Sequence, residues 1–353
     1  MSVSTPFVVF HHRRRSWLFG VAGFLWLIVG AACGGKAPDT PASTPASQPA
    51  APTTSGEKKP RVALLSPGPI SDDGWNAFGY DALKIIEKEL GCEVRQQQVN
   101  DSPADREQGF RAFAQEGFDV VIGHGGEFTD QALAVAKDFP RTTFVVTAGD
   151  KAAPNVVSVV FDTGQASYLA GAIAAMMSKT GRIGAIGGQN IPASARNLYA
   201  FRNGARAINP KIDVMIAFIG SWTDTAAARQ QALAMIDKGA DFLIHDCDAA
   251  AAGVFQAVKE RNIRAFGMQK DQSHLAPDHI VGSPTSNPQG LAEIVRRILQ
   301  KEQKGEVVHL GIRDNAVGFA IKKGFIPKEI EGKLNGLTLA IQKGEIDVFK
   351  EQP

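Results

Sequence analysis

The amino-acid sequence predicts an α/β protein built from two units, each with a mostly parallel sheet. Two observations support this prediction. From residue 61 onward, short apolar runs alternate with longer amphipathic stretches, the pattern of strands that alternate with helices. The alternation restarts after residue 162, without a visible sequence repeat. Because such strands pair in parallel and are covered by helices, we expect two similar units.

The first unit opens with a continuous apolar run at 62–65, which is typical of a buried strand. Gly91, Gly117 and Pro140 follow helical patterns and predict where those helices stop. The expected elements are, in order, strand 62–65, helix 78–90, strand 93–99, helix 103–116, strand 119–123, helix 129–138, strand 143–146 and strand 156–161.

The second unit begins with a helical stretch that is rich in small residues. Its expected elements are, in order, helix 167–178, strand 181–187, helix 193–208, strand 213–219, helix 224–238, strand 242–245, helix 251–261 and strand 264–267. Cys92 lies in the first unit and Cys247 in the second, so we expect two separate buried thiols rather than a disulfide.

Ligands of open α/β sheets bind beyond the carboxyl ends of the strands. The loops at those ends are 66–76, 124–128, 147–150, 188–192, 220–224, 246–248 and 268–272. In the first loop, Asp73 or Ser71 could cap the following helix or contact a ligand. Trp75 favours the second interpretation, because an indole in such a loop needs a partner for its ring and its N–H. In the second unit, Trp222 and Asp224 repeat this combination of an aromatic residue and a carboxylate after a strand. The two tryptophans, Trp75 and Trp222, either share a ligand or pack separately.

The N-terminus has the order of an export signal. Three arginines at 13–15 precede an apolar run at 17–29, and small residues lead to Cys33, as in a bacterial lipobox. We predict a signal peptide at 1–32 and a lipidated Cys33 that begins a flexible Pro/Ala/Ser/Thr-rich tether at 33–58. An uncleaved membrane anchor is the alternative, although the run is shorter than the about 20 residues of a spanning helix. The paired arginines leave the export route open between Sec and twin-arginine.

Composition excludes several function classes. The first 32 residues hold three arginines and no acids, which leaves 35 basic and 36 acidic residues. A nearly neutral domain gives no electrostatic case for binding nucleic acid. The residues at 245–248 (His-Asp-Cys-Asp) could suggest a metal or catalytic cluster, but alternation along an extended segment lets at most two of them converge. The chain also has no dinucleotide fingerprint, no Walker loop and no nucleophile elbow.

Several motifs together resemble the basic membrane protein (BMP) family, solute-binding lipoproteins of ABC importers that are related to the purine nucleoside receptor PnrA. They are ISDDGWN at 70–76, SYLAG at 167–171, GSWTD at 220–224, GAD at 239–241, DQ at 271–272 and IQKGEIDV at 341–348. The resemblance extends from about residue 59 to the end of the chain.

The resemblance implies two Rossmann-like lobes joined by three hinge strands, which is the type I periplasmic-binding-protein architecture. We assign residues 59–162 and 284–305 to lobe I, and residues 163–283 and 306–353 to lobe II. In the family, a purine nucleoside lies between aromatic rings in the cleft. Trp75 matches the aromatic position of the first motif, with Asp73 and Asn76 as its polar residues, and Trp222 is the aromatic candidate of lobe II.

Two departures from the family pattern indicate a divergent branch. Residues 267–272 (GMQKDQ) have no carboxylate where nucleoside receptors usually have Asp before the Asp-Gln pair, which puts a grip on ribose hydroxyls in doubt. Gly74 and Trp75 stand where the family has Lys-Ser-Phe. The ligand could therefore be a nucleobase or another flat heterocycle, riboflavin-type compounds included.

We therefore expect a lipid-anchored solute-binding protein that closes around a purine nucleoside, nucleobase or similar heterocycle and delivers it to an ABC permease. It needs no cofactor. Tryptophans would stack on the ligand, polar side chains would hydrogen-bond to it, and glycines would let the backbone approach it. The candidate ligand-binding residues are Asp73, Gly74, Trp75, Asn76, Gly125, Gly126, Trp222, Asp224, Asp246, Asp248 and Asp271. The alternatives are an exported nucleoside hydrolase-type enzyme and a ligand sensor for a membrane signalling partner.

Overall fold

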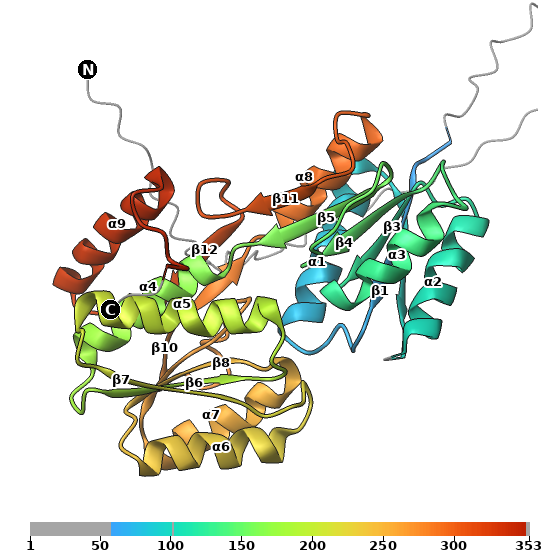
Figure 1. The fold of residues 1–353 in the computed structure, drawn as a ribbon. Coiled ribbons are helices and arrows are strands. Elements are labelled where there is room, and N and C mark those ends of the chain that lie inside the picture. The colour runs from blue at the N-terminus through green and yellow to red at the C-terminus, as the bar shows by residue number, and fades with distance from the viewer. Residues whose placement is uncertain (1–57, 101, 351–353) are drawn as a thin grey trace, which may run out of the picture. The chain divides into compact units, whose positions relative to one another are not determined.

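The computed structural model describes residues 58–100 and 102–350 (Figure 1). The predictions for the signal peptide, for Cys33 and for the tether lie outside the described residues. Within the described part of the chain, no helix combines the length and apolarity needed to cross a membrane.

The first sheet has six parallel strands in the order β11-β5-β4-β3-β1-β2. The strands are β1 (Arg61–Ser66), β2 (Glu93–Gln98), β3 (Val120–His124), β4 (Thr143–Thr147), β5 (Val156–Phe161) and β11 (Val307–Leu310). The helices that accompany it are α1 (Trp75–Leu90), α2 (Pro103–Gln115), the 3₁₀ turn η1 (Gly126–Phe128), α3 (Thr129–Ala136) and α8 (Pro288–Leu299).

Helices cover both faces of this sheet, because successive apolar residues of a central strand point to opposite faces and pack against different helices. Val62 and Leu64 of β1 pack in one hydrophobic cluster with residues of α1 and α8, whereas Ala63 and Leu65 pack in another with residues of α2 and α3. All five residues of β3 are buried. A parallel sheet buried on both faces accounts for the continuous apolar runs of the sequence.

The second sheet repeats the plan in the order β12-β10-β9-β8-β6-β7, with only the β10–β12 pair antiparallel among the described strands. Its strands are β6 (Arg182–Gly187), β7 (Asp213–Phe218), β8 (Phe242–Asp246), β9 (Arg264–Phe266), β10 (Ile280–Ser286) and β12 (Val317–Ile321). The remaining helices are α4 (Gly164–Met177), α5 (Pro192–Ile208), α6 (Thr225–Asp237), the 3₁₀ turn η2 (Asp248–Ala250), α7 (Ala251–Arg261) and α9 (Lys328–Lys343).

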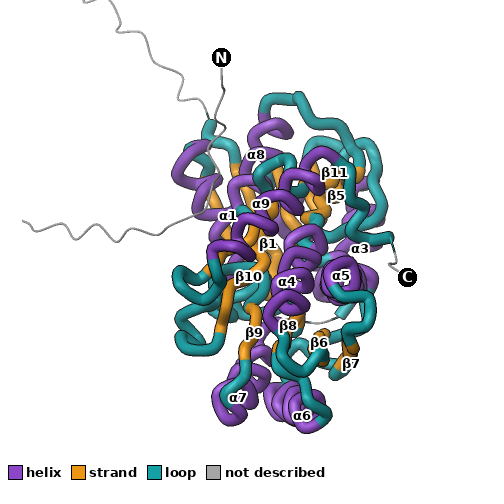
Figure 2. The backbone as a smooth tube through the Cα atoms, turned by 90° about the vertical axis from the view of Figure 1, so that its left-hand side faces the viewer, coloured by secondary structure: helices purple, strands orange, loops and turns teal. Residues whose placement is uncertain are grey.

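Helices α4 and α5 lie side by side against this sheet (Figures 1 and 2). Their backbones touch at two glycines: a Cβ on Gly171 would lie 1.9 Å from the carbonyl oxygen of Phe201, and a Cβ on Gly204 would lie 1.9 Å from that of Tyr168. Side chains of both helices pack in the same hydrophobic cluster as α1 and α8, so this core is continuous between the two sheets.

The predicted α/β class with two mostly parallel sheets is confirmed. The chain passes between the sheets three times, after β5, after β10 and after β11. Residues 307–310 pair with β5 of the first sheet, although the predicted lobe II includes them. Helix α8, within the predicted lobe I segment 284–305, packs against α1. Below, the first and second lobes are the parts built on the first and second sheets; their exact boundaries stay a prediction.

Candidate functional site

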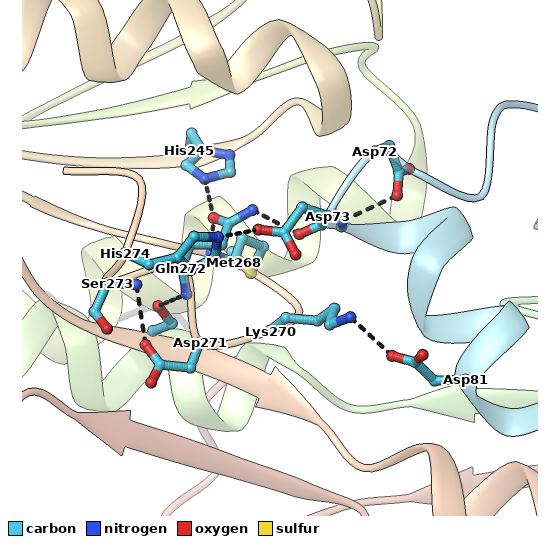
Figure 3. Close-up of polar contacts among 12 residues, drawn as sticks. Asp72, Asp73, Asp81, His245, Met268, Lys270, Asp271, Gln272, Ser273 and His274 are labelled. Atoms are coloured by element: carbon cyan, nitrogen blue, oxygen red, sulfur yellow. Dashed lines mark hydrogen bonds and ion pairs between the residues drawn. The ribbon is translucent and has the colours of Figure 1, made fainter. Parts of the chain in front are cut away.

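Loops at the carboxyl ends of β1 and β9 contact each other directly (Figure 3). The side-chain amide of Gln272 donates from Nε2 to the backbone oxygen of Asp73 at 3.0 Å. His274 Nε2 lies 3.0 Å from the Asp73 carboxylate, and Lys270 Nζ donates to the Asp81 carboxylate at 2.8 Å. Two of these bridges join the second lobe to the loop that leads into α1, and the third joins it to α1 itself.

The loop before α1 is organised by Asp72, and not by Asp73 or Ser71. One carboxylate oxygen of Asp72 accepts from the backbone N–H groups of Gly74 (3.0 Å) and Ala77 (2.9 Å). The other accepts from the backbone N–H (3.0 Å) and the side-chain amide (2.7 Å) of Asn76. Asp72 thus satisfies free amides of the first helical turn, as a capping residue does.

Asn76, a candidate ligand residue, is buried and takes part in the same loop. Its Oδ1 accepts from the backbone N–H of Gly68 at 3.2 Å, while its amide donates to Asp72. These bonds hold the loop 66–76 in one shape around the start of α1, where Trp75 stands. Asn76 therefore positions its neighbours in the described arrangement.

Trp75 stacks on His124, a residue from the end of β3. The ring centroids are 4.2 Å apart with an interplanar angle of 15°, and the Phe78 ring lies 5.8 Å from the indole. A Cβ on Gly79 would lie 2.7 Å from the imidazole, so only glycine at this position of α1 leaves room for the ring. Trp75 itself stays half-buried. The stack presents a flat aromatic surface of fixed orientation.

The protonation state of His124 follows from its partners. Its Nε2 lies 2.8 Å from the Trp75 carbonyl oxygen, which can only accept, so Nε2 carries the proton. Nδ1 then accepts from the Thr147 hydroxyl at 2.9 Å. Burial lowers the pKa of His124 to about 4, and the ring is neutral at physiological pH. Sequence reasoning marked this loop but chose its glycines; the buried strand that ends in histidine was the available signal.

Two carboxylates of the second lobe form an acidic wall at the end of β8. Burial raises the pKa of Asp246 to about 6, and a 3.0 Å hydrogen bond from the Asn197 amide opposes that shift. Burial also raises the pKa of Asp248 well above its ordinary value, and so do the nearby charges of Asp246, Asp72 and Glu127. Asp72 and Glu127 belong to the first lobe, so carboxylates from both lobes face one another here.

Gly74 marks where the lobes approach at this wall, because a Cβ on Gly74 would lie 3.9 Å from Oδ1 of Asp248. Asp248 has a backbone φ of 44°, in the left-handed region that aspartate tolerates better than most residues. Asp248 and Gly74 therefore lie next to each other, although they come from different lobes.

Gln272 is another site residue that the sequence prediction did not include. It is 2 % exposed, and its Oε1 accepts from His245 Nε2 at 2.9 Å and from the Met268 backbone N–H at 3.0 Å. Its neighbour Asp271, which was predicted, is exposed and accepts from the Ser273 backbone N–H at 3.0 Å, which is a local turn. We therefore do not carry Asp271 into the proposed site.

The loop of Trp222 lies beside the acidic wall, because the Trp222 carbonyl accepts from the Ala250 N–H of η2 at 3.0 Å. Its indole covers Gly188, where a Cβ would lie 2.2 Å from the ring. In the described structure, the aromatic contacts of Trp75 are with Phe78 and His124 rather than with Trp222. The shared clamp of two indoles stays a prediction.

Three further candidates have local structural roles. Asp224 is exposed and caps α6, accepting from the Ala227 N–H at 2.9 Å, so it leaves the proposed site. Gly125 has a φ of 149°, and a Cβ on Gly126 would lie 2.7 Å from the Ala148 carbonyl oxygen. Both glycines are needed for the turn that places η1 and Glu127.

Cys92 and Cys247 are buried in different hydrophobic clusters, as expected of two separate thiols. Among residues 58–100 and 102–350, no group of three or more His, Cys, Asp or Glu side chains is arranged to hold a metal ion.

Comparison with known proteins gives one family. The family model of PnrA-like ABC transporter substrate-binding proteins matches residues 59–352. A purine-binding protein of Brucella abortus (strain 2308) is 31 % identical over 297 residues, which cover 83 % of this chain and 84 % of the relative. Basic membrane protein A2 of Borrelia garinii subsp. bavariensis is 27 % identical over 300 residues, covering 82 % and 88 % of the two chains.

A solved structure shares the fold. The ABC transporter solute-binding protein from Aeropyrum pernix K1 superimposes with a TM-score of 0.73 at 20 % identity, covering 82 % of this chain and 92 % of that one. The two-lobed architecture with mostly parallel sheets is therefore that of solute-binding proteins.

Proposed function

Because the chain belongs to the family of PnrA-like ABC transporter substrate-binding proteins, we propose that its ligand is a purine nucleoside, a purine base or a similar flat heterocycle. The family consists of binding proteins that serve ABC permeases rather than of enzymes, so the hydrolase alternative is set aside. The purine-binding relative from Brucella abortus supports this choice of ligand.

The observation that carries the proposal is the stack of Trp75 on His124. An indole held parallel to a neutral imidazole is a preformed platform for one more flat ring, and bases of every kind stack on such platforms. Rigidity reduces the entropy that is lost when the ligand binds. The bound heterocycle would lie against Trp75, between that platform and the acidic wall of the second lobe.

The acidic wall supplies the polar half of recognition. A purine nucleoside presents ribose hydroxyls together with an exocyclic amino group or a ring N–H, and these donate hydrogen bonds that carboxylates accept. Asp246, with a pKa of about 6, is mostly ionised at neutral pH and would accept from them. Such donors would also offset the repulsion between the Asp248 carboxylate and the neighbouring carboxylates of Asp246, Asp72 and Glu127. This arrangement favours nucleosides over phosphorylated nucleotides, whose charge the wall would repel.

We further propose the cellular setting that the sequence predicts. An export signal at 1–32 and lipidation of Cys33 would anchor the domain outside the cytoplasm by the tether 33–58. The anchored receptor would pass its ligand to an ABC permease after the two lobes close around it.

A thermal-shift panel tests the choice of ligand. Adenosine, guanosine, inosine, their free bases, riboflavin, AMP and several sugars are each added to the full chain. A compound that binds only the native state adds about 2.7 kcal/mol to the free energy of unfolding when its concentration is 100 times its Kd, and this raises the midpoint temperature of unfolding. We expect shifts with nucleosides or bases and none with AMP. A shift confined to sugars would reject the proposed ligand class.

A further inference from the structure

The segment 268–274 of the second lobe carries all three polar bridges described above, to Asp73 and Asp81 of the first lobe (Figure 3). Two of them come from more exposed side chains, since His274 and Lys270 are 61 % and 32 % accessible. Water and salt weaken such pairs. Only Gln272 makes its bridge from a buried position, so its contact is the one that water cannot replace.

The second lobe fixes the orientation of the Gln272 amide. The Met268 backbone N–H can only donate, so the side-chain atom 3.0 Å away from it is the oxygen. His245 must then donate from Nε2 to the same oxygen, as a neutral ring whose pKa burial lowers to about 4. The Gln272 backbone N–H also donates to the Ser283 hydroxyl of β10 at 3.3 Å. The amide nitrogen therefore points out of the second lobe in a fixed direction.

The Gln272 amide nitrogen donates to the backbone oxygen of Asp73, a residue with an uncommon backbone conformation. Asp73 has a φ of 52°, in the left-handed region that is uncommon for residues other than glycine. Its carbonyl belongs to the peptide that joins it to Gly74, directly before Trp75. A hydrogen bond to this carbonyl stabilises the strained conformation and sets the direction in which the chain enters α1.

We propose that Gln272 is a positioning residue for ligand binding: by holding the Asp73 carbonyl, it keeps the Trp75 loop of the first lobe in its stacking position when the lobes are in contact. Gln272 acts through Asp73 and Gly74 and does not touch the ligand. The proposal rests on the proposed function only for its effect on ligand affinity, because the effect on the loop itself needs no ligand.

The test compares Gln272→Glu with Ser273→Ala in the full chain. The glutamate keeps the volume and an oxygen for His245 and Met268, but its second oxygen cannot donate to the Asp73 carbonyl at neutral pH. Ser273 lies in the same loop, and its hydroxyl makes no hydrogen bond within the described part of the chain. Peptide-resolved hydrogen exchange is measured without ligand, and adenosine and guanosine affinities are measured by calorimetry.

We expect residues 66–77 to exchange at least tenfold faster in Gln272→Glu than in wild type at pH 8, with β6 and β8 unchanged. The difference should shrink near pH 5, because a protonated carboxyl can donate to Asp73. Affinity should fall about tenfold or more in the same variant, and Ser273→Ala should match wild type in both measurements. If Gln272→Glu does not fold, Gln272→Asn, whose shorter amide cannot reach both lobes, must show the same local change.

Three results would overturn the proposal. One is unchanged exchange of 66–77 together with unchanged affinity in the variants. Another is faster exchange spread evenly over the second sheet, which would make Gln272 a core residue of that lobe. The third is lost affinity with unchanged exchange, which would make it a direct ligand contact. If wild type binds no purine at all, the proposed function fails while the exchange comparison still decides the role of Gln272.

Discussion

Trp75→Ala should weaken purine binding by roughly 5- to 150-fold, because a base stacked on an aromatic side chain is worth about 1–3 kcal/mol by alanine substitution. The variant removes the platform and leaves His124 without its parallel partner at 4.2 Å. Calorimetric titration of wild type and variant with the same nucleoside measures the change. Circular dichroism and the unfolding midpoint show whether the half-buried side chain also affects folding.

Trp75→Phe is the matched control for this prediction. A phenyl ring can still stack between His124 and a heterocycle, so the affinity should stay within about tenfold of wild type. Equal affinity of wild type and a folded Trp75→Ala would remove Trp75 from the site and, with it, the observation that supports the ligand class.

Asp246→Asn should stabilise the ligand-free protein at pH 8 by up to about 3 kcal/mol. The folded-state pKa of Asp246 is about 6 against an ordinary 3.8, and each unit corresponds to about 1.4 kcal/mol. Since the folded pKa is the higher one, folding takes up a proton between these values. The contribution of Asp246 to the free energy of unfolding is therefore lost as pH rises through about 6. The asparagine side chain of the variant does not ionise, so the variant does not lose this stability. The oxygen of that side chain can still accept from Asn197, 3.0 Å from the carboxylate.

The pH profile gives the second half of this prediction. His124 and His245 have pKa values lowered from 6.5 to about 4, so the unfolded chain binds more protons in that range and stability falls on acidification. Asp246 has the opposite slope and partly cancels it. In Asp246→Asn, urea unfolding should show a steeper loss from pH 6.5 to pH 4 than in wild type. Parallel profiles for both proteins would contradict a raised pKa at Asp246.

Stability and ligand affinity should change in opposite directions in this variant. A buried carboxylate is costly in the empty site but accepts from ligand donors, whereas an amide has lost half of that accepting capacity. A functional site is a common place for such a conflict between local stability and chemistry.

The core of the fold could be predicted because strand burial determines composition. Residues 120–122 of β3 and residues 62–65 of β1 are buried on both faces of the sheet and are all apolar, which is visible in the sequence. The predicted elements end at residue 267, so β10, β11 and β12 were not among them. The Val307–Leu310 run of β11 is short and partly exposed at the edge of its sheet. Its pairing with β5 depends on tertiary contacts that local pattern does not encode.

For the site, the sequence indicated which loops to consider but not which side chains face inward. A loop has no period of 2 or 3.6, so neighbours such as Asp271 and Gln272, or Asp72 and Asp73, cannot be told apart by position. The local backbone conformation determines which side chains face the site. The positive φ values of Asp73 and Asp248 give these two loops irregular backbone conformations. The roles of Asp72, His124 and Gln272 became visible only through their hydrogen bonds.

Titration calorimetry of the full chain with adenosine, guanosine, inosine and their bases tests the central claim most directly. A heterocycle held on Trp75 between the lobes predicts saturable binding of one molecule per chain, with a negative heat-capacity change from buried apolar surface and no released base or sugar. Absence of binding to every compound of this set by folded protein, or turnover of a nucleoside into base and sugar, would contradict the account.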